Sequence, residues 1–344
     1  MGAIWSYTGR YSEESQASTL YEHPLWLSRP EYVNGLATYM KQSAGRLQFV
    51  FNWIIGETRI SPLWQRKLAV ASSSPVSNSS QSQKGSFPVV IFSHGLSGCR
   101  HFYSTYCASL ASNGFVVAAI EHSDYSACWT YKLIPDSISG RLKERYFPIR
   151  IVDKDDKRMF KIRNQQLNKR VSECVKALHV LEEIALGQLQ ADNIAIGKEF
   201  DWSMFKAAAV LDGWLYPLEP GHYERATQPT LFLNAGKWQY FENIERMHKL
   251  RNIAEKPMFT FRDAEHQTFT DFAFLVNSYI GRRMKLHGET APEVAMEAIV
   301  QMTVAFFNKE QNQESRDLRH LVNEKYSHFV VDGCPPHLMN GKPG

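Results

Sequence analysis

The residues best suited to chemistry in this chain are an aspartate, Asp212, and a histidine, His266. Asp212 directly follows the apolar run Ala207–Leu211, and His266 comes shortly after the run Phe259–Phe261. Such runs are typical of buried strands, and an α/β sheet carries its functional groups at the carboxyl ends of its strands. A carboxylate beside a histidine holds the imidazole in one tautomer and stabilises the imidazolium. We therefore predict that Asp212 and His266 form an acid–histidine couple.

A loop suited to binding an oxyanion comes earlier in the chain. The apolar run Phe87–Phe92 leads into Ser93-His94-Gly95-Leu96-Ser97-Gly98. Glycine lets the backbone approach a substrate closely, and the N–H of Leu96 can donate to developing negative charge. Loop, acid and histidine follow one another here in the chain order of an α/β-hydrolase. We predict that fold, with a doubly wound, mostly parallel sheet.

The nucleophile that this order requires is absent from the sequence. An α/β-hydrolase carries its serine in a G-x-S-x-G turn between a strand and a helix. No two of the twenty glycines lie four residues apart, so this turn occurs nowhere in the chain. Ser97 does not replace it, because Gly95-Leu96-Ser97-Gly98 is one residue too short. The glycine spacings of dinucleotide-binding and phosphate-binding loops are also absent.

The sequence gives little indication of a metal ion, a cofactor or a nucleic-acid partner. Glu121-His122-Ser123-Asp124 offers possible metal ligands, but neither H-x-H-x-D nor H-E-x-x-H occurs. The five cysteines include no C-x-x-C pair, which is typical of reduced thiols. A net charge of +4 is too small to indicate nucleic acid. We expect no metal ion, no cofactor and no nucleic-acid partner.

Strands and helices alternate along most of the chain, as a doubly wound sheet requires. Apolar runs predict strands over residues 87–92, 115–120, 207–211, 230–233 and 259–261. Helices are predicted over 102–112, along a stripe from Leu167 to Ala185, and over 269–286 and 291–307, whereas the charged residues 141–156 predict a loop. The expected organisation is an aromatic, membrane-proximal region over 1–71, a Ser-rich loop over 72–86, an incomplete hydrolase domain over 87–308 and a tail over 309–344.

Two features point to a membrane surface. The first six residues fit M-G-x-x-x-[ST], which predicts myristoylation of Gly2. The apolar run Leu47–Ile55 is either a buried strand or helical turn, or a segment that lies at a membrane interface. No secretory signal opens the chain and no run of eighteen apolar residues spans a bilayer. We expect a cytoplasmic protein that is partly at membranes through a myristoylated N-terminus.

The chain resembles the platelet-activating-factor acetylhydrolase family, which consists of serine-dependent phospholipases of α/β-hydrolase fold. The resemblance covers roughly residues 20–308, and the N-terminal motif resembles that of the family's intracellular branch. The segments that carry it are Phe87–Arg100, Leu110–Ser126, Ile162–Leu181, Leu211–Leu218 and His266–Phe272. The resemblance implies a phospholipid substrate, with Asp212 as the acid, His266 as the base and Leu96 as an oxyanion donor.

One departure from the family puts activity in doubt. After Asp201–Lys206 the family continues with a strand that ends in G-H-S-x-G-G and a helix, whereas here Lys206 is followed directly by Ala207. The region before Tyr21 also looks shortened. Three hypotheses remain: an esterase of this family that is inactive for lack of its serine, a non-catalytic membrane-associated relative that binds lipid or regulates a partner, and a truncated product that folds poorly.

Overall fold

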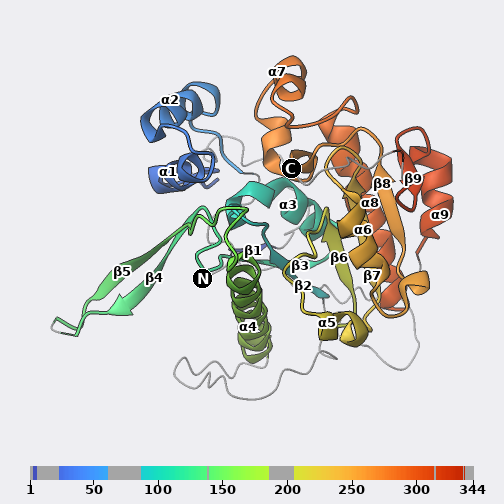
Figure 1. Cartoon of the computed structure of the whole chain (residues 1–344), viewed down its shortest axis with the longest axis horizontal. Helices are drawn as coiled ribbons and strands as arrows, with labels where there is room; N and C mark the ends of the chain where they lie inside the picture. Colours follow the sequence, from blue (N-terminus) through green and yellow to red (C-terminus); the bar gives the residue numbers. More distant parts are fainter. Residues whose placement is uncertain are drawn as a thin grey trace, which may run out of the picture. The chain divides into compact units, whose positions relative to one another are not determined.

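The computed structural model describes residues 3–5, 23–60, 87–137, 139–185, 205–313, 315–335 and 337 (Figure 1). Two compact units divide the chain. The first comprises Met1–Ile151 and Lys169–Ala195, and the second comprises Val152–Asn168 and Ile196–Gly344. Gly2 and the Ser-rich loop 72–86 lie outside the described residues.

The sheet of the first unit has the strand order β1-β3-β2. Strand β2 (Val89–Ser93) runs parallel to β3 (Val116–Ile120), and helix α3 (Ser104–Ser112) connects them. Both strands were expected from their apolar runs, which are typical of strands covered on two faces. Strand β1 (Ala3–Trp5) pairs antiparallel with β3. This strand was not predicted.

A β-hairpin replaces part of the loop predicted over residues 141–156, and that prediction was wrong. Strand β4 (Trp129–Pro135) pairs antiparallel with β5 (Leu142–Pro148). Charged residues join this ladder because its stability comes from backbone hydrogen bonds and cross-strand contacts. Arg29 donates two hydrogen bonds to Glu144 of β5, at 2.9 and 2.7 Å, and lies 4.5 Å from the ring centroid of Tyr131 in β4.

Among the described residues, two more helices and part of a third belong to the first unit. Helices α1 (Pro30–Tyr39) and α2 (Ala44–Ile54) form a pair, and α1 begins with a proline, whose fixed φ and missing N–H suit the first turn. The predicted long helix is confirmed as α4 (Met159–Ala185), which begins before the apolar stripe does. The boundary between the units falls within α4, after Asn168. None of the described helices is long and apolar enough to cross a membrane.

The sheet of the second unit has the order β6-β7-β8-β9. Three of its strands were predicted and run parallel: β6 (Ala208–Leu211), β7 (Thr230–Ala235) and β8 (Met258–Phe261). Helices α5 (Pro220–Arg225), α6 (Phe241–His248) and α8 (Pro292–Glu310) belong to the same unit. Phe232, Met247 and Met258 are among the buried residues of its hydrophobic core. The α/β class is therefore confirmed.

Two predictions for the second unit need correction. The helix expected over 269–286 is broken into 3-10 turns at His266–Phe269 and Asp271–Phe274, followed by α7 (Ser278–Arg283). Thr270 interrupts it, because its backbone is extended and its hydroxyl accepts from the Phe272 N–H. The expected tail contains α9 (Leu318–Leu321) and β9 (Val330–Asp332), which pairs antiparallel with β8. Burial of Leu318, Leu321 and Val330 holds this segment on the unit.

The sheets β1-β3-β2 and β6-β7-β8-β9 each have an apolar strand at one edge. Among the described residues, β2 pairs only with β3, and β6 pairs only with β7. Val89 in β2 is 44% exposed, and all four residues of β6 are only partly buried. Apolar parallel strands are normally covered on both faces and flanked by other strands. The strand that the family resemblance leads us to expect immediately before Ala207 would precede β6 in the chain.

Candidate active site

The structure joins the predicted acid and base. Nδ1 of His266 lies 2.7 Å from Oδ2 of Asp212, and the aspartate side chain is fully buried while that of the histidine is 40% exposed. Asp212 follows β6 directly and has φ +49°, a left-handed conformation that is uncommon for residues other than glycine. Such strained backbone is concentrated at functional sites.

The other carboxylate oxygen of Asp212 is held by two further donors. The Ala235 N–H donates to Oδ1 at 2.8 Å, and so does Nε2 of Gln239, also at 2.8 Å. Asn243 in turn donates to Gln239 at 2.7 Å, which fixes the orientation of the amide. Because the acceptor at Nδ1 is a carboxylate, His266 carries its proton on Nδ1 and leaves Nε2 able to accept one.

An aromatic side chain supports the histidine ring. Trp238 stacks on His266 with ring centroids 4.3 Å apart and an interplanar angle of 20°. The loop after β7 therefore supplies both Trp238 and Gln239 to the site. Sequence reasoning missed both residues, because a tryptophan and a glutamine carry no motif that would mark them as partners of an acid–histidine pair.

The predicted oxyanion loop lies in the first unit, whereas Asp212 and His266 belong to the second. Among the described residues, the Leu96 N–H makes no hydrogen bond, as an available oxyanion donor requires. The neighbouring Ser97 has φ +58°, and its N–H donates to the Ser126 carbonyl at 2.8 Å. A side chain at Gly95 would meet the Tyr103 hydroxyl at 3.1 Å, so the glycine permits a tight loop.

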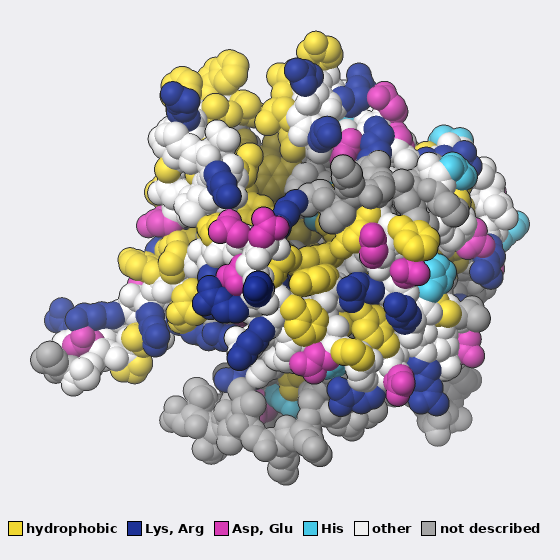
Figure 2. Space-filling model, in the orientation of Figure 1, with side chains coloured by type: hydrophobic (Ala, Val, Ile, Leu, Met, Phe, Trp, Pro, Cys, Tyr) yellow, Lys and Arg dark blue, Asp and Glu magenta, His cyan; other side chains and the backbone are white. Residues whose placement is uncertain are grey.

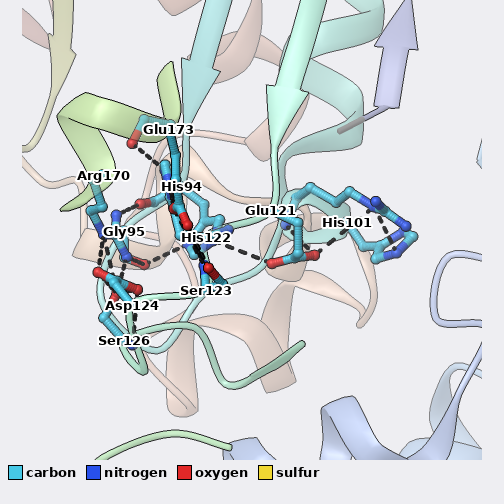
Figure 3. Close-up of polar contacts among 12 residues, drawn as sticks. His94, Gly95, His101, Glu121, His122, Ser123, Asp124, Ser126, Arg170 and Glu173 are labelled. Carbon is cyan, nitrogen blue, oxygen red and sulfur yellow. Dashed lines mark hydrogen bonds and ion pairs between the residues drawn. The ribbon is translucent and has the colours of Figure 1, made fainter. Parts of the chain in front are cut away.

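A buried ion pair ties this loop to α4 (Figure 3). Nε of Arg170 lies 3.0 Å from Oδ2 of Asp124, whose side chain is fully buried. The same guanidinium donates to the carbonyls of His94 and Gly95. Burial would raise the pKa of Asp124, but Arg170 and the hydrogen bonds from Ser126 outweigh it and hold that pKa below its usual range. Arg170 therefore helps to fix the loop, beside the backbone hydrogen bond from Ser97 to Ser126.

The residues considered as metal ligands are engaged in other ways. Within the described ranges, no group of three or more His, Cys, Asp or Glu side chains is arranged to hold a metal ion. His122 lies between Ser93 and Glu173, and His94 contacts Glu121 at 3.3 Å. All five cysteines are free.

The parallel α/β sheets, with Asp212 after β6 and His266 after β8, define an α/β-hydrolase. A ferulic acid esterase from Streptomyces cinnamoneus has a similar fold, with a TM-score of 0.53, 16% sequence identity, and coverage of 96% of this chain and 87% of that one. The sequence model of the family described as platelet-activating factor acetylhydrolase, isoform II, matches residues 10–209 and 203–325. The chain belongs to this family.

Individual relatives agree with this assignment. The platelet-activating factor acetylhydrolase of Bos taurus is 30% identical, over 92% of this chain and 75% of that protein. That of Gallus gallus is 28% identical, over 93% of this chain and 80% of that protein. A putative phospholipase A2 of Schizosaccharomyces pombe is 58% identical over 43 residues, which are 12% of this chain. These relatives support a lipid esterase.

The family match is interrupted where the sequence led us to expect a missing segment. Its two parts overlap at residues 203–209, which include the junction of Lys206 and Ala207. The alignment with the chicken protein extends over 362 positions, more than the 344 residues of the chain. That relative therefore carries residues that have no counterpart here.

Proposed function

We propose that this chain is a phospholipid esterase of the platelet-activating-factor acetylhydrolase family whose acid–histidine pair has lost its nucleophile. Membership of this family implies that the substrates would be phosphocholine lipids with an sn-2 acetyl or short oxidised acyl group, which the enzyme would hydrolyse. This is the reaction of a 1-alkyl-2-acetylglycerophosphocholine esterase. The contact of 2.7 Å between Asp212 and His266 supports this proposal most directly. The absence of any G-x-S-x-G turn from the sequence supports its second half.

The family resemblance implies the roles of the remaining residues. In a complete site, a serine would attack the ester carbonyl and Nε2 of His266 would take the proton from its hydroxyl. Asp212 would hold the imidazole and stabilise its charged form, and the Leu96 N–H would donate to the oxyanion. Without the elbow serine no acyl-enzyme forms at this site, so the Asp212–His266 pair has no group to activate.

We expect the purified chain to hydrolyse a phospholipid with an sn-2 acetyl group no faster than buffer does. The physical reason is that the elbow supplies both the nucleophile and one of the two oxyanion donors, and both are lost with it. Release of acetate from the lipid measures the rate. Catalysed release that disappears in His266→Ala would contradict the proposal, and release that disappears in Ser97→Ala would identify Ser97 as the nucleophile.

The second candidate function is a non-catalytic relative that associates with membranes and binds lipid or regulates a partner. Helix α2, which contains most of the run Leu47–Ile55, buries none of its residues, so the hypothesis of a buried segment was wrong. Phe49 is 71% exposed and Trp53 is 78% exposed, and apolar side chains are visible on the surface around α2 (Figure 2). Exposed aromatic residues on a helix suit the boundary between headgroups and acyl chains.

We expect Phe49→Ser and Trp53→Ser to reduce binding to phosphatidylcholine–phosphatidylserine vesicles. Removing one buried aromatic side chain should weaken binding by about tenfold or more. Flotation of the protein with the vesicles measures the bound fraction. Asn52→Ala is the matched control, because Asn52 is an exposed polar residue of the same helix. Equal flotation of all variants would show that α2 does not insert.

The N-terminal anchor is a separate prediction. One myristoyl chain gives only marginal membrane binding, and a second apolar signal makes association stable. The chain co-expressed with an N-myristoyltransferase should therefore float with vesicles to a greater extent than the Gly2→Ala variant. On this basis we infer a cytoplasmic protein that is partly at membranes. Equal flotation of the two would leave α2 as the sole contact.

A further inference from the structure

A serine, a histidine and a carboxylate lie in a row within the first unit, and none of them belongs to the Asp212–His266 pair. Ser93 is the last residue of β2, His122 follows β3, and Glu173 is on α4. Oγ of Ser93 lies 2.8 Å from Nε2 of His122. Nδ1 of the same ring lies 2.9 Å from Oε2 of Glu173, a contact that Figure 3 shows. Ser93 is opposite Ile120 in the parallel register, so both strands end at one edge of the sheet.

The protons in this row are placed as nucleophilic catalysis requires. Burial would raise the pKa of Glu173, but hydrogen bonds from His122 and Ser123 hold it below its usual range, so the carboxylate is charged. It therefore accepts the Nδ1–H of His122. Burial lowers the pKa of His122 to about 4 despite Glu173, so the ring is neutral at pH 7. A neutral ring with its proton on Nδ1 accepts the Ser93 hydroxyl proton at Nε2.

The serine is the accessible member of the row. Ser93 is exposed at the end of an edge strand, whereas the His122 side chain is fully buried and only 15% of that of Glu173 is exposed. Cys174 also contacts the Ser93 hydroxyl, and burial raises the pKa of its thiol to about 11. At neutral pH this thiol stays protonated and does not compete as a nucleophile.

We propose that Ser93, His122 and Glu173 form a second nucleophilic site, which reacts with small activated esters and phosphonates independently of Asp212 and His266. Oγ of Ser93 would attack the carbonyl carbon and form a C–O bond while Nε2 of His122 takes its proton. The ester C–O bond then breaks, the leaving alcohol receives the proton, and water later releases the acyl group. The Leu96 N–H, in the same loop, is an available donor for the oxyanion.

The low basicity of His122 sets the expected rate. A base accepts a proton most efficiently when its pKa lies near the working pH. We therefore expect slow turnover, and the reaction is best detected with a fluorophosphonate, whose P–F bond breaks as the serine oxygen binds phosphorus. The full chain should give one adduct per molecule, located by mass spectrometry on the peptide that contains Ser93.

Matched variants test the assignment. Ser93→Ala should remove this adduct, whereas Ser97→Ala, a serine of the same loop, should keep it. Glu173→Gln should slow labelling on the order of 100-fold or more, because an amide no longer fixes the Nδ1–H tautomer. A surface serine that reacts without a base would not respond to that change. An adduct on another residue, or an unchanged rate in Glu173→Gln, would overturn the proposal.

A control on the unaltered chain tests whether labelling of Ser93 requires the folded protein. Labelling of Ser93 should disappear when the protein is unfolded in urea, because His122 and Glu173 then no longer lie beside the serine. Equal labelling of native and unfolded protein would overturn the proposal without any variant. Circular dichroism melts of Ser93→Ala and Glu173→Gln show whether each change is local.

Discussion

Insertion of a strand–G-H-S-x-G-G–helix segment from a family member between Lys206 and Ala207 should turn the chain into an esterase. Asp212 and His266 already lie 2.7 Å apart, and the Leu96 N–H is unpaired among the described residues. The insert would add the serine, the elbow's own N–H donor and a strand next to β6. Release of acetate from an sn-2 acetyl phospholipid should then rise well above that of the unmodified chain, and the midpoint of thermal unfolding should rise.

Two variants of the insertion protein test which residues act. His266→Ala should abolish the new activity. Asp212→Asn should lower it about 10⁴-fold, the loss found when a serine protease carries the same substitution and holds the histidine in the wrong tautomer. A folded insertion protein that hydrolyses the lipid in spite of His266→Ala would show that another group is the base.

Replacement of Arg170 by methionine should unfold much of the first unit. The change leaves the buried Asp124 carboxylate without its cation, and loss of one partner of a buried ion pair costs about 3–5 kcal/mol. The same change releases the carbonyls of His94 and Gly95. Urea denaturation at pH 7 measures the free energy of unfolding. Arg158→Met is the matched control, because Arg158 forms an exposed pair with Asp156 and should leave stability nearly unchanged.

Acid should reduce the difference in free energy of unfolding between the unaltered chain and Arg170→Met. The pKa of Asp124 is lower in the folded chain than its usual value of about 3.9. Its stabilising contribution is therefore present above pH 4 and is lost as the pH falls through the folded pKa. In Arg170→Met the unpaired carboxylate accepts a proton more easily, so the two proteins should approach each other in stability below pH 4. An equal difference at pH 7 and pH 3 would show that Arg170 acts through packing instead.

The sequence predicted the parts of the fold whose residue types match their surroundings. Strands β2, β3, β6, β7 and β8 were found because each is a short apolar run, the pattern typical of a parallel strand inside an α/β sheet. Strand β5 was missed because three of its seven residues are charged, and the backbone hydrogen bonds of a ladder do not depend on side-chain type. Thr270 breaks a helix that apolar spacing favoured, because its hydroxyl offers the backbone another partner.

The residues of the candidate sites also fall into those that the sequence predicted and those that it did not. Asp212 and His266 were found because each follows an apolar strand in the order of a known fold. Gln239 has no such marker, since its contact with Asp212 depends on how the loop after β7 turns. His122 was considered only as a metal ligand, because Glu173 is 51 residues away in the chain and reaches it only through the packing of α4.

Among the residues that the structure describes, β2 and β6 each have an edge without a partner strand, and these edges should make the yield of soluble protein depend on its concentration. An edge strand presents a row of N–H and C=O groups, which is a template for a strand from another chain. Neither Val89–Ser93 nor Ala208–Leu211 contains a proline or a charged side chain that would discourage such pairing. At low concentration, or when chaperones bind it quickly, the chain should therefore stay in solution. At high concentration it should form aggregates rich in intermolecular β-structure.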